Sequence, residues 1–112
     1  MAIALTKPWR PLNEAEVAKL GGHMGVYELG NGDGEVVYVG FAGGKSRFGL
    51  KGELMRVLRE EPERSTRFRV EVTTAYATRY RELLMAHLAE SGALPEQNRN
   101  ERLPSLGRLS PG

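Results

Sequence analysis

Residues 25–40 decide the fold, and they read GVYELGNGDGEVVYVG. The runs Gly25–Leu29 and Glu35–Gly40 are rich in Val and Tyr, which favour β-strands. The residues between them, 30–34, read GNGDG and are dense in types that reverse a chain. We therefore predict a β-hairpin.

Three further elements are expected after the hairpin. Apolar residues recur at helical spacing after the loop 41–46 until Pro62, which predicts a helix over 47–61. Residues 67–73 alternate apolar and charged types, the pattern of a strand with one buried face and its arginines in solvent. Residues 77–90 carry an apolar stripe at i, i+3, i+4 spacing, which predicts a second long helix.

The segment before the hairpin predicts a short helix. Asn13 followed by Glu16 has the form of a capping box, and Gly21-Gly22 would end a helix of two turns. The full order of elements then predicts an α/β fold, with a small three-stranded sheet flanked by helices and an N-terminal helical extension. The extension would span 1–24, the main domain 25–98 and a C-terminal tail 99–112.

Composition excludes several classes of function. The chain has 112 residues, the size of one domain, and no cysteine, which rules out disulfides, a cysteine nucleophile and thiolate metal sites. Asp33 is its single aspartate, too few for a kinase, an EF-hand or a multi-aspartate two-metal nuclease. No apolar run is long enough to cross a bilayer, so we expect no membrane partner and a cytoplasmic location.

The charge balance permits binding to nucleic acid without requiring it. The net charge is +2, and most of the 16 basic residues are arginines. Arginines at 67, 69, 79 and 81 either follow a phosphate backbone or form solvated faces interleaved with glutamates.

The hairpin resembles the GIY-YIG nuclease superfamily. Gly25-Val26-Tyr27 and Tyr38-Val39-Gly40 stand on the two expected strands, and Arg47 follows at the start of the next helix. The resemblance covers 25–98 and includes the order of elements. It implies an endonuclease that hydrolyses phosphodiester bonds in nucleic acid, either DNA or RNA with DNA favoured, with Mg²⁺ or Mn²⁺ as cofactor.

The same resemblance implies roles for individual residues. Tyr27 would take the proton of the attacking water, Tyr38 and Arg47 would contact the phosphate, and a glutamate would hold the cation. Lys51 stands where the family often has histidine. Further contacts to nucleic acid would come from three residues: Gly40, Lys45 and Asn98.

Two alignments with the family pattern give different positions for the metal ligand. The register of the tripeptides and helices places Glu82 at the ligand position, whereas counting back from Asn98 places Ala86 there. Glu82 could equally form a surface ion pair with Arg79, one turn before it.

Other candidates also have structural interpretations. Tyr27 and Tyr38 could be cross-strand packing partners. His87 lies in the apolar stripe and is expected to be a core or interfacial histidine, and Trp9 is expected to cover the core from the N-terminal segment. The alternative function is accordingly a catalytically inactive module of the same fold that binds nucleic acid or protein.

Overall fold

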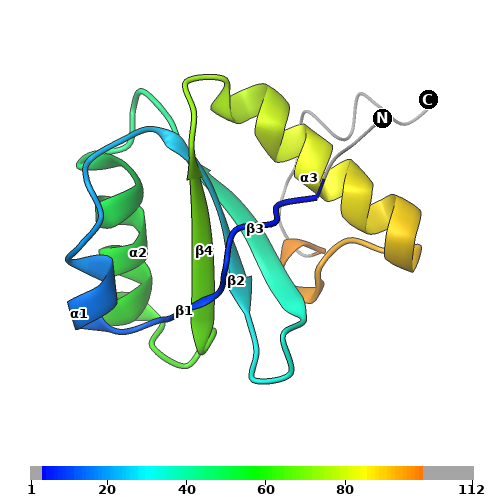
Figure 1. The fold of residues 1–112 in the computed structure, drawn as a ribbon, viewed down its shortest axis with the longest axis horizontal. Helices are drawn as coiled ribbons and strands as arrows, with labels where there is room; N and C mark the ends of the chain where they lie inside the picture. The colour runs from blue at the N-terminus through cyan, green and yellow to red at the C-terminus, as the bar shows by residue number, and fades with distance from the viewer. Residues whose placement is uncertain (1–3, 100–112) are drawn as a thin grey trace.

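The computed structural model describes residues 4–99, which form a small α/β domain with a four-stranded antiparallel sheet and three α-helices (Figure 1). The elements, in chain order, are β1 (Arg10–Pro11), α1 (Glu14–Val17), β2 (Gly25–Gly30), β3 (Val36–Ala42), α2 (Gly49–Glu60), β4 (Arg67–Val72), α3 (Tyr76–Ser91) and the 3₁₀ helix η1 (Glu96–Asn98). The predicted residues 100–112 of the tail lie outside the described part of the chain.

The predicted hairpin is confirmed. β2 and β3 pair antiparallel, with Tyr27 opposite Gly40 and Leu29 opposite Tyr38. The side chain of Asn31 fixes the turn, because its Oδ1 accepts from the backbone N–H groups of Asp33 and Glu35 at 2.9 and 3.0 Å. The Asn31 side chain therefore stabilises the turn by accepting hydrogen bonds from two of its backbone N–H groups.

The sheet has four strands, and the prediction of three is wrong. Its order is β1-β4-β2-β3, so β2 is central and β4 pairs with it on the side away from β3. The missed strand is β1, in which Arg10 lies opposite Phe68 and Pro11 opposite Arg67. A strand of two residues is too short to show an alternation of apolar and polar residues in the sequence. β1 is therefore recognised only from its pairing with the edge of β4.

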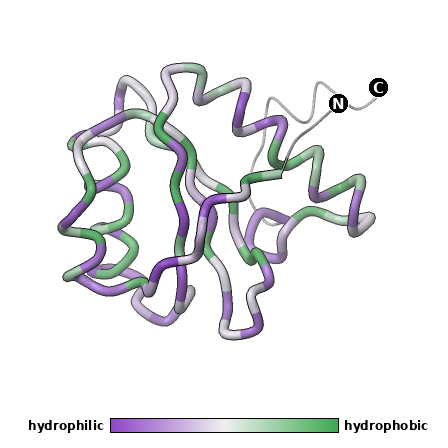
Figure 2. Tube along the Cα trace, in the orientation of Figure 1, coloured by the Kyte–Doolittle hydropathy of each residue, from purple (hydrophilic) through white to green (hydrophobic). Residues whose placement is uncertain are grey.

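Helices cover both faces of the sheet (Figure 1). One core, which includes Tyr27, Leu29, Leu54 and Phe68, lies on the side of α1 and α2. The other, which includes Leu5, Val26 and Leu83, lies on the side of α3. In Figure 2 both long helices alternate hydrophobic and hydrophilic residues, as expected of helices that bury one face.

Arg69 on β4 is largely covered rather than in solvent, which corrects the expectation of a solvated face for 67–73 at that position. Arg69 packs over the ring of Trp9 at 4.1 Å and pairs with Glu28 on β2. Trp9 itself lies so close to Gly30 that a Cβ there would come within 2.7 Å of the indole. The N-terminal segment therefore crosses this face, and no periodicity within β4 could show that.

Two helix boundaries also differ from the sequence prediction. Asn13 does cap α1, since its side chain accepts from the N–H of Glu16 at 2.8 Å, but α1 has one turn and ends at Val17 rather than at the glycines. The helix predicted over 47–61 begins at Gly49, because Phe48 before it has φ 64° and ψ 16°, which lie in the left-handed region and not in that of the right-handed α-helix. None of the described helices is long and apolar enough to cross a membrane.

Candidate functional site

The two hairpin tyrosines lie together on the α2 side of the sheet. Tyr27 is buried, with 1% of its surface exposed, and its ring lies across Gly40. A Cβ on Gly40 would come within 2.4 Å of that ring, so glycine is required there by packing. The rings of Tyr27 and Tyr38 are 6.0 Å apart and inclined by 42°, which confirms them as packing partners. The catalytic role stays a prediction.

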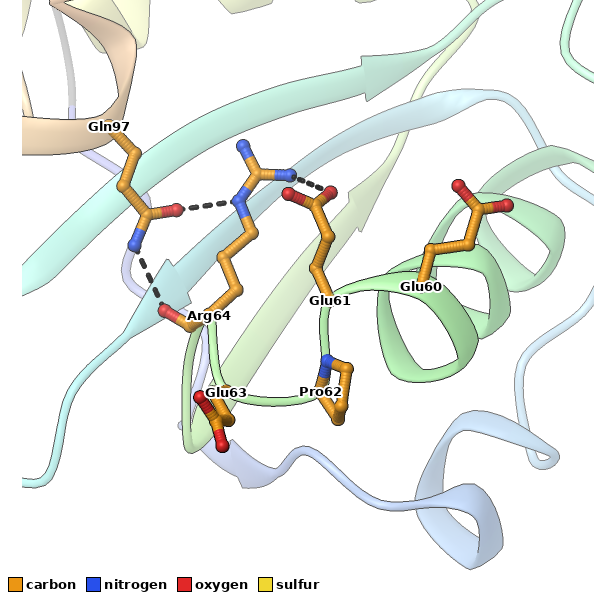
Figure 3. Close-up of a pocket in the computed structure, with 6 residues that line it drawn as sticks. All are labelled: Glu60, Glu61, Pro62, Glu63, Arg64 and Gln97. Atoms are coloured by element: carbon orange, nitrogen blue, oxygen red, sulfur yellow. Dashed lines mark hydrogen bonds and ion pairs between the residues drawn. The ribbon is translucent and has the colours of Figure 1, made fainter.

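Arg64 covers Tyr38 from outside. Its guanidinium stacks over the ring at 4.0 Å. Figure 3 shows that guanidinium held between the side chains of Gln97 and Glu61, with the Glu61 contact at 3.1 Å. Gln97 also donates to the backbone carbonyl of Arg64 at 2.9 Å. Arg64 therefore has its charge neutralised and its geometry fixed, and it joins the end of α2 to η1.

Arg56, on α2, lies within electrostatic range of Tyr27. Burial lowers the pKa of Arg56, but Glu53 foremost and Tyr27 to a smaller extent raise it above its ordinary value. Arg56 also contacts Glu53 at 3.4 Å and lines a hollow on the helix surface. Arg56 is thus a permanent cation that lines the hollow and interacts electrostatically with Tyr27.

The hollow runs along α2 from Arg47 before the helix to Arg59 in its last turn, and most of the charged residues that line it are cations. Its lining residues are Arg47, Phe48, Lys51, Gly52, Glu53, Met55, Arg56 and Arg59. Arg47 and Lys51, both singled out from the sequence, come together here, and Lys45 is exposed in the preceding loop. We call Lys45, Arg47, Lys51 and Arg59 the α2 basic surface.

Glu82 is not brought to the tyrosines. It lies on α3, whose buried residues pack on the opposite face of the sheet from Tyr27. Its carboxylate is 3.4 Å from Arg79, which also contacts Glu71 at 2.8 Å. The hydrogen bond to Glu71, together with Glu82, raises the pKa of Arg79 despite burial. The predicted surface pair of Glu82 with Arg79 is therefore present.

This arrangement does not fit a divalent cation at Glu82. An arginine occupies the space between the two nearest carboxylates, and Ala86, the other aligned position, has no ligand atom and is buried. Across residues 4–99, no three His, Cys, Asp or Glu side chains gather as a metal site would require.

The side chain of Asn98 has a structural role, because it hydrogen-bonds to the backbone of β3. It is fully buried, and its side chain accepts from the N–H of Val39 at 2.7 Å and donates to the Val39 carbonyl at 3.0 Å. The amide thus continues the sheet at the free edge of β3, next to Gly40, and ties η1 to that strand.

The family of the chain follows from a comparison with family models. Residues 3–90 match a model described as a domain of unknown function, DUF7508. The chain belongs to the DUF7508 family. No curated protein matches it. The DUF7508 match spans the hairpin, α2, β4 and nearly all of α3, so it includes the α2 basic surface and Glu82, whereas Asn98 lies beyond it.

The DUF7508 domain also contains a buried charged cluster that the sequence did not reveal. Glu28 is 1% exposed, and one of its oxygens accepts from Arg69 at 2.8 Å while the other lies 3.1 Å from Nε2 of His87. His87 therefore lies at the edge of the core with the buried carboxylate of Glu28 as its hydrogen-bond partner. The available signal was a glutamate at the centre of an apolar strand, but its partners come from distant segments.

Proposed function

We propose that this DUF7508 domain binds nucleic acid through the α2 basic surface. The observation that carries the proposal is the hollow of α2, which is lined by Arg47 and Lys51 in addition to two arginines that pair with glutamates. In that hollow Arg56 contacts Glu53 at 3.4 Å and Arg59 contacts Glu60 at 3.3 Å. Neutralising phosphates with such side chains supplies most of the affinity of sequence-independent binding.

The geometry of the helix supports this. Lys51, Met55 and Arg59 are spaced four residues apart on α2, so they follow one side of the helix at steps of about 6 Å, and Arg47 lies two residues before the helix begins. In the described structure, no carboxylate lies within ion-pair distance of Lys45, Arg47 or Lys51. These cations are therefore available to phosphates at no cost of broken ion pairs.

The hairpin supports a kinship of this domain with the GIY-YIG superfamily. The tyrosine of the first tripeptide, Tyr27, pairs directly with the glycine of the second, Gly40. Both tripeptides lie beside α2, and Arg47 precedes that helix. We accordingly propose DNA as the partner, ahead of RNA.

Loss of two cations from the α2 basic surface should lower the salt dependence of binding. For Arg47→Gln/Lys51→Gln, the slope of log K against log salt should fall by about 1.8, because each lost phosphate contact removes about 0.9. Fluorescence anisotropy with a labelled DNA duplex over a salt series measures this slope.

A matched control removes the same charge from the α3 side. Lys7→Gln/Arg81→Gln changes the net charge equally, and its salt slope should stay that of the parent protein. An equal fall in both double variants would show that net charge alone matters. Absence of binding by the folded parent at low salt would contradict the proposed function.

Phosphodiester hydrolysis is the second candidate function. It is favoured by Tyr27, whose hydroxyl lies within electrostatic reach of Arg56 at the α2 hollow. A nearby cation favours the phenolate form, which a tyrosine needs to accept a proton from water. The position of Glu82 does not favour it, so metal dependence is left for the experiment to decide.

Plasmid nicking tests this candidate. If Tyr27 is the base, Tyr27→Phe should lower cleavage about a hundredfold, the usual scale of general base catalysis, with little change in thermal unfolding. The assay contains Mg²⁺ or Mn²⁺, with a chelator in a parallel series. Tyr80→Phe, which removes a hydroxyl from the core on the α3 side of the sheet, is the control and should cleave like the parent. Parental cleavage by Tyr27→Phe would refute the catalytic assignment.

A further inference from the structure

Phe48 is an exposed aromatic residue in a strained backbone conformation. Its side chain is 71% exposed, and its φ of 64° makes it the non-glycine residue with positive φ among those described. A bulky side chain is disfavoured in this region, and it persists only where the surrounding structure fixes it. Burial of the ring does not explain the conformation, since the ring is in solvent.

The backbone on both sides of Phe48 is anchored. The Phe48 carbonyl accepts from the N–H of Gly52 at 3.1 Å, and the N–H of Leu50 donates to the carbonyl of His23 at 2.9 Å. Gly49 also has positive φ, and a Cβ there would come within 2.4 Å of the Gly22 backbone. The chain therefore enters α2 along a fixed path, and the ring of Phe48 is held outward from it.

The surroundings of the ring are cationic. Phe48 lines the α2 hollow beside Arg47 and Lys51, with Met55 on the next turn. An aromatic ring among phosphate-binding cations is the combination by which proteins bind single strands, because each base offers a face for stacking while the cations follow the backbone. In a duplex the base faces are already stacked, so the same ring gains little from it.

We infer that Phe48 is a stacking platform for an unpaired base, so that the α2 basic surface prefers single-stranded over duplex nucleic acid. This inference rests on the proposed function and specifies its ligand. The left-handed backbone keeps the ring among the cations of the hollow, where a strand bound through its phosphates would place its bases.

The test compares a labelled oligo(dT) with a duplex of the same length. Phe48→Asn is the informative variant, because asparagine tolerates positive φ and removes the ring. Its affinity for oligo(dT) should fall about 5- to 150-fold, the effect of losing one stacked base, while its affinity for the duplex stays that of the parent. Phe48→Trp should retain oligo(dT) binding.

Controls separate this inference from the proposed function. Met85→Gln removes an exposed apolar side chain on α3 and should leave both affinities unchanged. Thermal unfolding should show Phe48→Asn to be at least as stable as the parent, and Phe48→Gly provides a second ring-free variant if it is not. Equal oligo(dT) affinity of the parent and both ring-free variants would overturn the inference while leaving the proposed function intact. A parent protein that binds neither ligand would overturn both.

Discussion

Glu28→Gln is expected to lower the free energy of unfolding by about 3 kcal/mol, the lower end of the range for removing one partner of a buried ion pair. Glutamine keeps the size of the side chain but removes the charge that neutralises Arg69, whose side chain is 16% exposed. One carboxylate oxygen accepts from Arg69 and the other lies 3.1 Å from Nε2 of His87, so the amide of glutamine can keep the hydrogen bond to Arg69 only as a neutral acceptor. Chemical denaturation monitored by fluorescence measures the loss.

Two comparisons isolate the buried pair. Glu63→Gln makes the same chemical change on an exposed loop, and it should alter stability by less than about 0.5 kcal/mol. Arg69→Met removes the cation but keeps an apolar stem near Trp9. In the double variant Glu28→Gln/Arg69→Met, the loss should be smaller than the sum of the single losses, because no unpaired charge remains. Additive losses would contradict a coupled pair.

Local sequence patterns predicted the elements that depend on nearest neighbours. The turn GNGDG specified the hairpin because a single side chain, that of Asn31, can satisfy the backbone of that turn. The apolar spacing specified α2 and α3 to within about two residues, since each buries one stripe of its surface.

Features that depend on distant segments were not predictable in the same way. β1 exists because β4 offers an unpaired edge, and Arg69 of β4 is covered because the N-terminal segment crosses that face. The cluster at Glu28 requires Arg69, which lies 41 positions further along the chain, and His87, which lies 59 positions further. None of these contacts produces a local period, so the sequence could only mark Glu28 as an anomaly in an apolar strand.

The same distinction between local and distant contacts applies to the residues of the candidate site. Tyr27, Tyr38 and Gly40 come together because paired strands fix their register. Arg47 and Lys51 line the same hollow because Arg47 lies two residues before α2 and Lys51 lies in its first turn. Glu82 belongs to a helix on the other side of the sheet, and linear spacing contains no information about the side on which a helix packs.

Gly25→Ala is expected to destabilise the domain by about 3 kcal/mol, the upper end of the range for overpacking a core. A Cβ at Gly25 would come within 2.2 Å of the Glu71 carbonyl oxygen and 3.0 Å of Leu50. The first contact is with the backbone of β4, in which Val72 lies opposite Gly25. A clash with backbone cannot be relieved by a change of side-chain rotamer. Separation of β2 from β4 at this end would weaken the sheet at its central strand.

The control for this prediction is Gly32→Ala in the hairpin turn, where a Cβ would meet nothing within 4 Å. Its stability should lie within about 0.5 kcal/mol of the parent, as for ordinary surface changes. Equal stability of the two variants would show that β4 can move away from β2 at little cost. A loss confined to Gly25→Ala would establish that the first tripeptide needs its glycine for strand packing, as Gly40 is needed beneath Tyr27. The glycines of the two tripeptides would then be accounted for by packing alone, and only the tyrosines and Arg47 would bear on the chemistry of the site.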